Sequence, residues 1–253
     1  MAAISTQALG KIVTETVPYK DGDVELNGYL AYDDAMKEKR PGVLVVHEWW
    51  GLNDFAKEKT RQLAELGYVA FAADMYGQGH VATDPAEAGK LAGQFRDNST
   101  LWRTRAKAAY DALARNPHVD TAKLAAIGFC FGGSTVLQLA ASGADLVGVV
   151  SFHGSLMPIA EPDAQRIKGK LLILHGAADT AVPESAVKAF WESLRNTAVD
   201  WQLIVYAGAK HSFTNPASDK MGAEGVGYNE TAARRAWQQM RLFFDDVLGP
   251  IKK

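Results

Sequence analysis

The chain has a single cysteine among its 253 residues. One cysteine excludes an intramolecular disulfide framework and any cysteine-rich zinc site. No apolar stretch reaches the roughly 20 residues that span a bilayer, so no membrane partner is expected. An excess of one charge is also missing, because 27 basic residues face 29 acidic ones and the formal net charge is −2. This balance gives no reason to expect nucleic acid as a partner.

The N-terminus also lacks a basic segment followed by an apolar run, so no signal peptide is predicted. A free thiol is consistent with a reducing compartment, and we expect the protein to be cytoplasmic. Hydrophobic residues make up 47% of the chain and charged residues 22%, which is enough for a substantial core. The length predicts one α/β domain over residues 1–253, with residues 1–11 as a poorly structured extension.

Apolar runs and helical patterns alternate along the chain. The predicted strands are 12–17, 24–32, 43–47, 68–72, 123–127, 146–152, 170–174 and 201–206, and the predicted helices are 54–66, 84–115 with a break near 97–99, 134–141, 183–194 and 229–248. Repeated strand-helix units indicate a mainly parallel sheet with helices on both faces. Residues 214–228 are the longest irregular stretch and contain three glycines, so we expect a mobile loop there.

The cysteine lies in a Gly-x-Cys-x-Gly turn between Gly128 and Gly132. A buried strand leads into this turn and a helix leads out, which is the pattern of a nucleophile elbow. A thiol at a helix N-terminus ionises readily and attacks as the thiolate. The alternative is a buried structural cysteine, because free cysteine is among the most buried residue types. The pattern favours Cys130 as a nucleophile.

Two further residues stand where a catalytic triad needs them. Asp179 follows the strand 170–174, and His211 follows the strand 201–206. The carboxyl ends of parallel strands meet at one edge of the sheet, so both side chains can reach Cys130 there. His211 is expected to take the thiol proton and return it to the leaving group, while Asp179 holds the imidazole tautomer. The order of nucleophile, acid and histidine is that of α/β-hydrolases.

Five separated segments of the sequence are similar to the motifs of a known family. Residues 47–53, 73–77, 128–133, 176–179 and 211–213 resemble the dienelactone hydrolase family. The resemblance implies an α/β-hydrolase fold with about eight mostly parallel strands and no large cap domain. It also implies ester or lactone hydrolysis without a metal or organic cofactor, and a role for Glu48 in contacting the thiol and assisting thiolate formation. The family's oxyanion hole maps to the backbone N–H groups of Trp49 and Phe131, one in the loop after the third strand and one just after the nucleophile.

A substrate pocket is expected near these groups. Its candidate residues are Trp50, Tyr76, Gln78, Phe152, Phe213 and Asn215. Family members that take the anionic lactone hold its carboxylate with two arginines, and this chain has Gln78 and Asn215 at those positions. We therefore expect uncharged substrates, with Arg96, Arg103 or Arg105 as the alternative source of a cation. His153 follows a strand, and a place for it near the pocket remains an alternative to simple hydrogen bonding.

The sequence thus predicts a hydrolase of esters or lactones that forms a thioacyl-enzyme at Cys130. The expected partner is a small-molecule ester, lactone or triester. One alternative is hydrolysis of neutral phosphotriesters by the same thiolate. An alternative of another class is a thiol redox sensor or binding protein on a hydrolase fold, and the presence of Asp179 and Glu48 weighs against it. Stoichiometric labelling of Cys130 without ester turnover would favour that reading.

Overall fold

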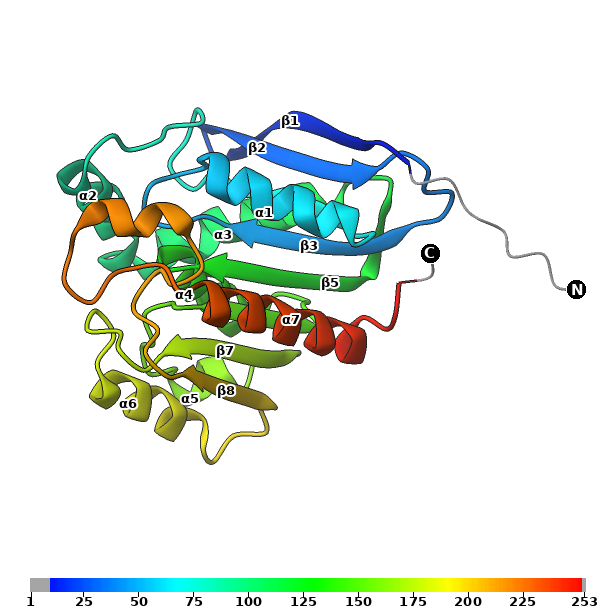
Figure 1. Cartoon of the computed structure of the whole chain (residues 1–253). Coiled ribbons are helices and arrows are strands. Elements are labelled where there is room, and N and C mark those ends of the chain that lie inside the picture. Colours follow the sequence, from blue (N-terminus) through cyan, green and yellow to red (C-terminus); the bar gives the residue numbers. More distant parts are fainter. Residues whose placement is uncertain (1–9, 252–253) are drawn as a thin grey trace, which may run out of the picture.

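The structure, a computed structural model, describes residues 10–251 (Figure 1). Of the expected N-terminal extension, residues 1–9 lie outside the described residues. Strands and helices alternate in the order β1 Ile12–Asp21, β2 Val24–Asp33, β3 Arg40–Val46, α1 Asp54–Glu65, β4 Val69–Ala72, α2 Pro85–Arg96, α3 Ser99–Ala114, β5 Val119–Phe129, α4 Phe131–Ala141, β6 Gly148–Phe152, α5 Glu161–Ala164, β7 Lys170–Gly176, α6 Glu184–Leu194, β8 Trp201–Tyr206, the short 3₁₀ helix η1 Pro216–Met221, and α7 Glu230–Val247.

The eight strands form one sheet in the order β1-β2-β4-β3-β5-β6-β7-β8. The β1–β2 hairpin is antiparallel and pairs antiparallel with β4, and all other neighbours are parallel. This confirms the expected eight-stranded α/β-hydrolase fold. The hairpin is longer than predicted, because β1 continues through Pro18 to Asp21. A proline is tolerated there because β1 is an edge strand, where no neighbour needs its missing N–H.

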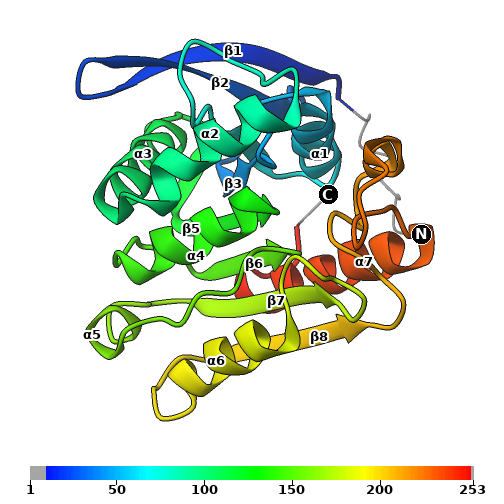
Figure 2. The same ribbon diagram turned by 90° about the vertical axis from the view of Figure 1, so that its left-hand side faces the viewer.

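Helices cover both faces of the sheet (Figure 2). Helices α1 and α7 lie on one face, while α3, α4 and α6 lie on the other (Figures 1 and 2). The strand β3 shows why its apolar run is continuous. Leu44 and Val46 belong to the core under α3 and α4, whereas Val43 and Val45 belong to the core under α1 and α7. A strand with helices on both sides needs apolar side chains at every position.

Residues 214–228, expected as a mobile loop, are anchored in the structure. Part of the segment forms the 3₁₀ helix η1. The carbonyl of Gly225 accepts a hydrogen bond from the backbone N–H of His211 at 2.8 Å, and the N–H of Gly227 donates to the carbonyl of His211 at 3.1 Å. The sequence pattern missed this because it carries no periodic apolar signal. The segment therefore fixes the backbone on both sides of the candidate histidine.

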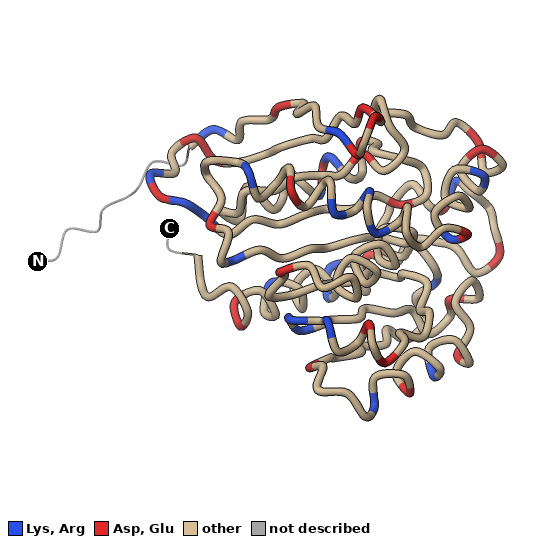
Figure 3. The backbone as a smooth tube through the Cα atoms, turned by 180° about the vertical axis from the view of Figure 1, so that it is seen from behind, with Lys and Arg blue, Asp and Glu red and all other residues tan. Residues whose placement is uncertain are grey.

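Basic and acidic positions are interspersed along the backbone in the view of Figure 3. This agrees with the near balance of charges in the sequence. Within residues 10–251, no helix combines the length and the apolar character needed to cross a membrane.

Candidate active site

The nucleophile turn joins β5 directly to α4. Cys130 occupies the N-cap of α4 with φ 52° and ψ −116°, a strained conformation for a residue with a side chain. The flanking glycines are required by close approach. A Cβ on Gly128 would lie 2.0 Å from the carbonyl oxygen of Gly132, and one on Gly132 would lie 2.1 Å from that of Val46. The turn therefore exists only with glycine at these two positions.

The three triad candidates form one hydrogen-bonded chain. Nε2 of His211 lies 3.1 Å from Sγ of Cys130, and its Nδ1 lies 2.8 Å from Oδ2 of Asp179. The other carboxylate oxygen of Asp179 accepts a hydrogen bond from the backbone N–H of Val182 at 2.9 Å. Asp179 and His211 are 6% and 8% exposed. The arrangement thus has the order and the contacts that general base catalysis at a thiol requires.

Electrostatics within this chain favour a charged histidine. Burial by itself lowers the pKa of His211, but the negative charges of Cys130 and Asp179 and their hydrogen bonds raise it well above its usual range. An imidazolium beside a thiolate is the resting form of many cysteine nucleophiles. The surroundings of His211 therefore favour its charged form beside the sulfur of Cys130.

The backbone N–H groups of Trp49 and Phe131 have no hydrogen-bond acceptor among the described residues. By contrast, the N–H of Cys130 donates both to the carbonyl of Phe152 and to the ring of His153. The hydroxyl of Tyr76 donates to the carbonyl of Trp49 at 2.7 Å and so holds this loop. Both N–H groups are therefore available to an oxyanion, as the resemblance to the family implies.

The ring of Phe131 is fixed by a cluster of aromatic side chains. It stacks on Trp102 with the ring planes 3° apart, and it also contacts His47, Phe95 and Tyr76. This packing sets the start of α4 and hence the direction of the Phe131 N–H. Aromatic contacts of this kind add to the free energy gained by burial alone.

Glu48 is held by the loop that follows His211. Its carboxylate is buried, at 2% exposed, and accepts hydrogen bonds from Oγ of Ser212 at 2.8 Å and from Nδ2 of Asn215 at 2.5 Å. Both oxygens therefore point to the loop that follows His211, and neither makes a hydrogen bond with Cys130. Burial raises the pKa of Glu48, although both hydrogen bonds and the charge of His211 act against this.

A cavity of about 230 Å³ lies beside Glu48. Its walls are Glu48, Trp50, Asn53, Val81, Ala82, Ser212, Asn215, Ala217, Ser218 and Met221. Two of the expected pocket residues, Trp50 and Asn215, thus lie together at one cavity. Glu48 is the sole ionisable side chain among these lining residues, and none of them is a lysine or an arginine.

The other expected pocket residues lie elsewhere. Phe152 and Phe213 are 1% and 0% exposed and fill the core, where Phe152 packs on Phe129 and Phe213 packs on Tyr206. Gln78 lines an open hollow beside the β1–β2 hairpin, and its N–H donates to the carbonyl of Glu25. Aromatic residues after strand ends are as suited to a core as to a pocket, so the sequence could not separate the two cases.

Sequence reasoning gave no role to Ser212 and Thr214, which bracket Phe213 in the loop after His211. Ser212 holds Glu48, and Oγ1 of Thr214 lies 2.7 Å from Nε2 of His153. Both hydroxyls are buried, but a Ser or Thr in a loop is common and carries no signal by itself. The one available signal is their closeness in sequence to the triad histidine.

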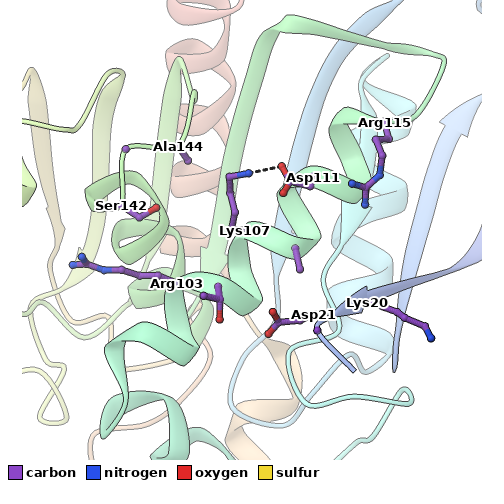
Figure 4. A pocket seen from close by; sticks show the side chains of 12 residues that line it. Lys20, Asp21, Arg103, Lys107, Asp111, Arg115, Ser142 and Ala144 are labelled. Carbon is purple, nitrogen blue, oxygen red and sulfur yellow. Dashed lines mark hydrogen bonds and ion pairs between the residues drawn. The ribbon is translucent and has the colours of Figure 1, made fainter. Parts of the chain in front are cut away.

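A separate hollow of about 510 Å³ lies between the β1–β2 hairpin and α3 (Figure 4). Among its charged side chains, Lys107 pairs with Asp111 at 2.6 Å (Figure 4). Arg103 pairs with Asp163, which lies outside the lining, at 2.6 Å. Of the candidate residues named from the sequence, Arg103 lines this hollow. Within residues 10–251, no group of three or more His, Cys, Asp or Glu side chains is arranged to hold a metal ion.

Comparison with known proteins places this site in a family. The model of the dienelactone hydrolase family matches residues 26–248. A candidate carboxymethylenebutenolidase from Aquifex aeolicus is 29% identical, over 92% of this chain and 99% of its own length. A solved structure named m3DLH has a TM-score of 0.92 and 43% identity, covering 94% of this chain and all of its own. A dienelactone hydrolase-like promiscuous phosphotriesterase from metagenomic libraries has a TM-score of 0.92 and 42% identity, covering 95% of this chain and all of its own. The chain belongs to the dienelactone hydrolase family and is an ester or lactone hydrolase.

Proposed function

We propose that the protein hydrolyses uncharged carboxylic esters and lactones through a thioacyl-enzyme on Cys130. The observation that carries this proposal is the continuous chain of hydrogen bonds from Cys130 through His211 to Asp179. A thiol that transfers its proton to a buried imidazole becomes a thiolate, which is a strong nucleophile near neutral pH.

In the acylation step, the thiolate of Cys130 adds to the carbonyl carbon and a C–S bond forms. The resulting oxyanion is received by the N–H groups of Trp49 and Phe131. The C–O bond then breaks, and His211 transfers its Nε2 proton to the departing alcohol. Asp179 holds the imidazole in place and stabilises its positive charge.

In the deacylation step, His211 takes a proton from water while the water oxygen adds to the thioester carbon. The C–S bond breaks and the carboxylic acid leaves. The thiolate and the imidazolium of His211 are then restored, so protons and charges balance over the cycle. Glu48 assists the first step, because its negative charge close to His211 favours the imidazolium form.

The preference for uncharged substrates rests on the cavity beside Glu48. A substrate carboxylate there would meet the charge of Glu48 and no lysine or arginine among the lining residues. Two like charges in a partly dry site repel strongly. The amide of Asn215 is already bound to Glu48 and carries no charge.

Neutral phosphotriesters are a second candidate substrate class. The similarity to a promiscuous phosphotriesterase at 42% identity supports this candidate. With an aryl phosphotriester, the thiolate of Cys130 would form an S–P bond while the P–O bond to the aryl group breaks and the phenol leaves. Water would then cleave the S–P bond. The same oxyanion hole would receive the phosphoryl oxygen.

The test is a substrate panel measured on the wild type and on Cys130→Ala. The panel contains neutral aryl esters, a neutral lactone, dienelactone and a neutral aryl phosphotriester. We expect the highest kcat/KM on a neutral ester or lactone and essentially no turnover by Cys130→Ala. Labelling of Cys130 without any turnover on the panel would instead support a redox or binding role.

A further inference from the structure

His153 lies directly behind the nucleophile turn. It follows β6, is 1% exposed and has a positive φ of 41°. A residue with a side chain at such a φ is strained and needs its surroundings to hold it. Its Nδ1 accepts a hydrogen bond from the backbone N–H of Cys130 at 3.1 Å. The side chain therefore supports the turn that presents the thiol.

These contacts determine which nitrogen of His153 carries the proton. A backbone N–H is always a donor, so Nδ1 must be an acceptor without a proton. The proton then lies on Nε2, which donates to Oγ1 of Thr214 at 2.7 Å. The neutral ring agrees with burial, which lowers the pKa of His153 well below its usual range, with the charge of His211 adding to the effect.

Thr214 connects this ring to the triad histidine. It lies three residues after His211 in the same loop and is 5% exposed. The rings of His153 and His211 also meet edge to face, with centroids 5.5 Å apart. The titratable groups that act on the pKa of His153 are His211 and His175. One neutral imidazole thus joins the nucleophile turn to the histidine loop.

We propose that His153 is a positioning residue that holds Cys130 and His211 in register through its hydrogen bond to Thr214. This proposal rests on the proposed function of Cys130 as the nucleophile. Because His153 acts through the other residues, its loss changes the formation of the thiolate–imidazolium pair and the rate of the chemical step. Its side chain is 1% exposed and does not reach a bound substrate, so we expect KM to change little.

The test compares Thr214→Val with Thr214→Ser. Valine has the shape of threonine but leaves Nε2–H of His153 without an acceptor, whereas serine keeps the hydroxyl. For Thr214→Val we expect kcat on a neutral aryl ester to fall about tenfold, as for one lost buried hydrogen bond, with KM within about twofold. Alkylation of Cys130 by iodoacetamide at pH 6.5 should slow by a similar factor. Thr214→Ser should restore both rates.

A second pair of variants separates positioning from general stability. His153→Asn keeps an acceptor for the Cys130 N–H and tolerates positive φ, but it cannot reach Thr214. It should behave like Thr214→Val, and the double variant should be no slower than either, because all three lack the same bond. Thr60→Val is the control. It also removes a buried hydroxyl, which donates to Ala56 in α1 at 2.7 Å, and should leave the kinetics unchanged.

The outcomes are distinct. A lower melting temperature for Thr214→Val, with wild-type kcat and a wild-type pH profile of alkylation, would overturn the proposal and leave His153 a structural residue. In that case an inactive Cys130→Ala would still uphold the proposed function. Turnover by Cys130→Ala would remove the proposed function itself, independently of the Thr214 variants.

Discussion

The amide of Asn215 donates a hydrogen bond to the carboxylate of Glu48 across 2.5 Å, although the two residues are 167 positions apart in sequence. The hydroxyl of Ser212 donates to the other oxygen of the same carboxylate. A buried negative charge is thus held by two neutral donors and by no arginine. The proposed preference for uncharged substrates rests on this relationship.

Substrate charge is therefore the first prediction. Neutral aryl esters should have a kcat/KM at least about tenfold higher than dienelactone, because a carboxylate beside Glu48 is repelled. Steady-state kinetics with both substrates at one ionic strength measure the ratio. A clear preference for dienelactone would mean that a cation outside the cavity lining holds the substrate carboxylate, as the two arginines do in other family members.

The variant that identifies such a cation is Arg96→Gln. Arg103 and Arg105 form ion pairs with Asp163 and Asp21. Arg96 is exposed, and its charge acts on the pKa of Tyr76. If Arg96 holds the lactone carboxylate, Arg96→Gln loses activity on dienelactone and keeps it on the neutral ester. Equal kinetics of Arg96→Gln and the wild type on both substrates would exclude it.

The second prediction concerns the triad as a unit. His211→Asn should lower kcat by about three orders of magnitude or more, and Asp179→Asn by a comparable factor. The double variant should be little worse than either, because each change disables the same proton transfer. Additive losses in a double-mutant cycle would show that the two residues act independently of each other.

The third prediction concerns the charge of Glu48. Glu48→Gln keeps the shape and removes the negative charge that favours the imidazolium of His211. Alkylation of Cys130 near neutral pH should slow several-fold, and acylation should slow with it, while the circular dichroism spectrum stays unchanged. The matched control is Glu58→Gln, an exposed carboxylate paired with Arg61 on α1. An alkylation profile for Glu48→Gln that matches the wild type would remove Glu48 from the mechanism.

The fourth prediction is a pH dependence of stability. Burial lowers the pKa of His47 from 6.5 to about 4. Between these pH values His47 is therefore protonated in the unfolded chain and neutral in the folded chain. The free energy of unfolding should therefore fall by about 3 kcal/mol as the pH drops from 6.5 to 4. His153, whose pKa is also lowered, adds in the same direction.

Urea denaturation at several pH values measures this slope. His47→Gln should flatten it, and His118→Gln, a change at an exposed loop position, should leave it unchanged. An equal slope for His47→Gln and the wild type would contradict a lowered pKa of His47 in the folded chain.

The sequence predicted those parts of the molecule that local rules specify. The turn at Cys130 was predictable because its two glycines are required by backbone contacts of 2.0 and 2.1 Å. Asp179 and His211 were predictable because each follows a buried strand, and the strand ends of a parallel sheet meet at one edge. The structure brings both within hydrogen-bond distance of their expected neighbours.

The partners of Glu48 and His153 were not predictable in this way. Asn215 and Thr214 lie in a segment without periodicity, and which buried group a loop amide or hydroxyl meets depends on the fold of the whole loop. That Phe152 and Phe213 lie in the core was not predictable either, because aromatic residues at strand ends suit both a core and a pocket. Local pattern fixes the backbone of this site better than it fixes its polar contacts.

The central claim is that the acyl group passes through Cys130. The direct measurement is mass spectrometry of enzyme quenched with acid during turnover of a neutral aryl ester, followed by digestion and sequencing of the modified peptide. The account predicts an acyl group on Cys130 in the wild type, more of it in His211→Asn if deacylation is slowed further than acylation, and none in Cys130→Ala, which should be inactive. An acyl group on another residue, or full turnover by Cys130→Ala, would contradict the account.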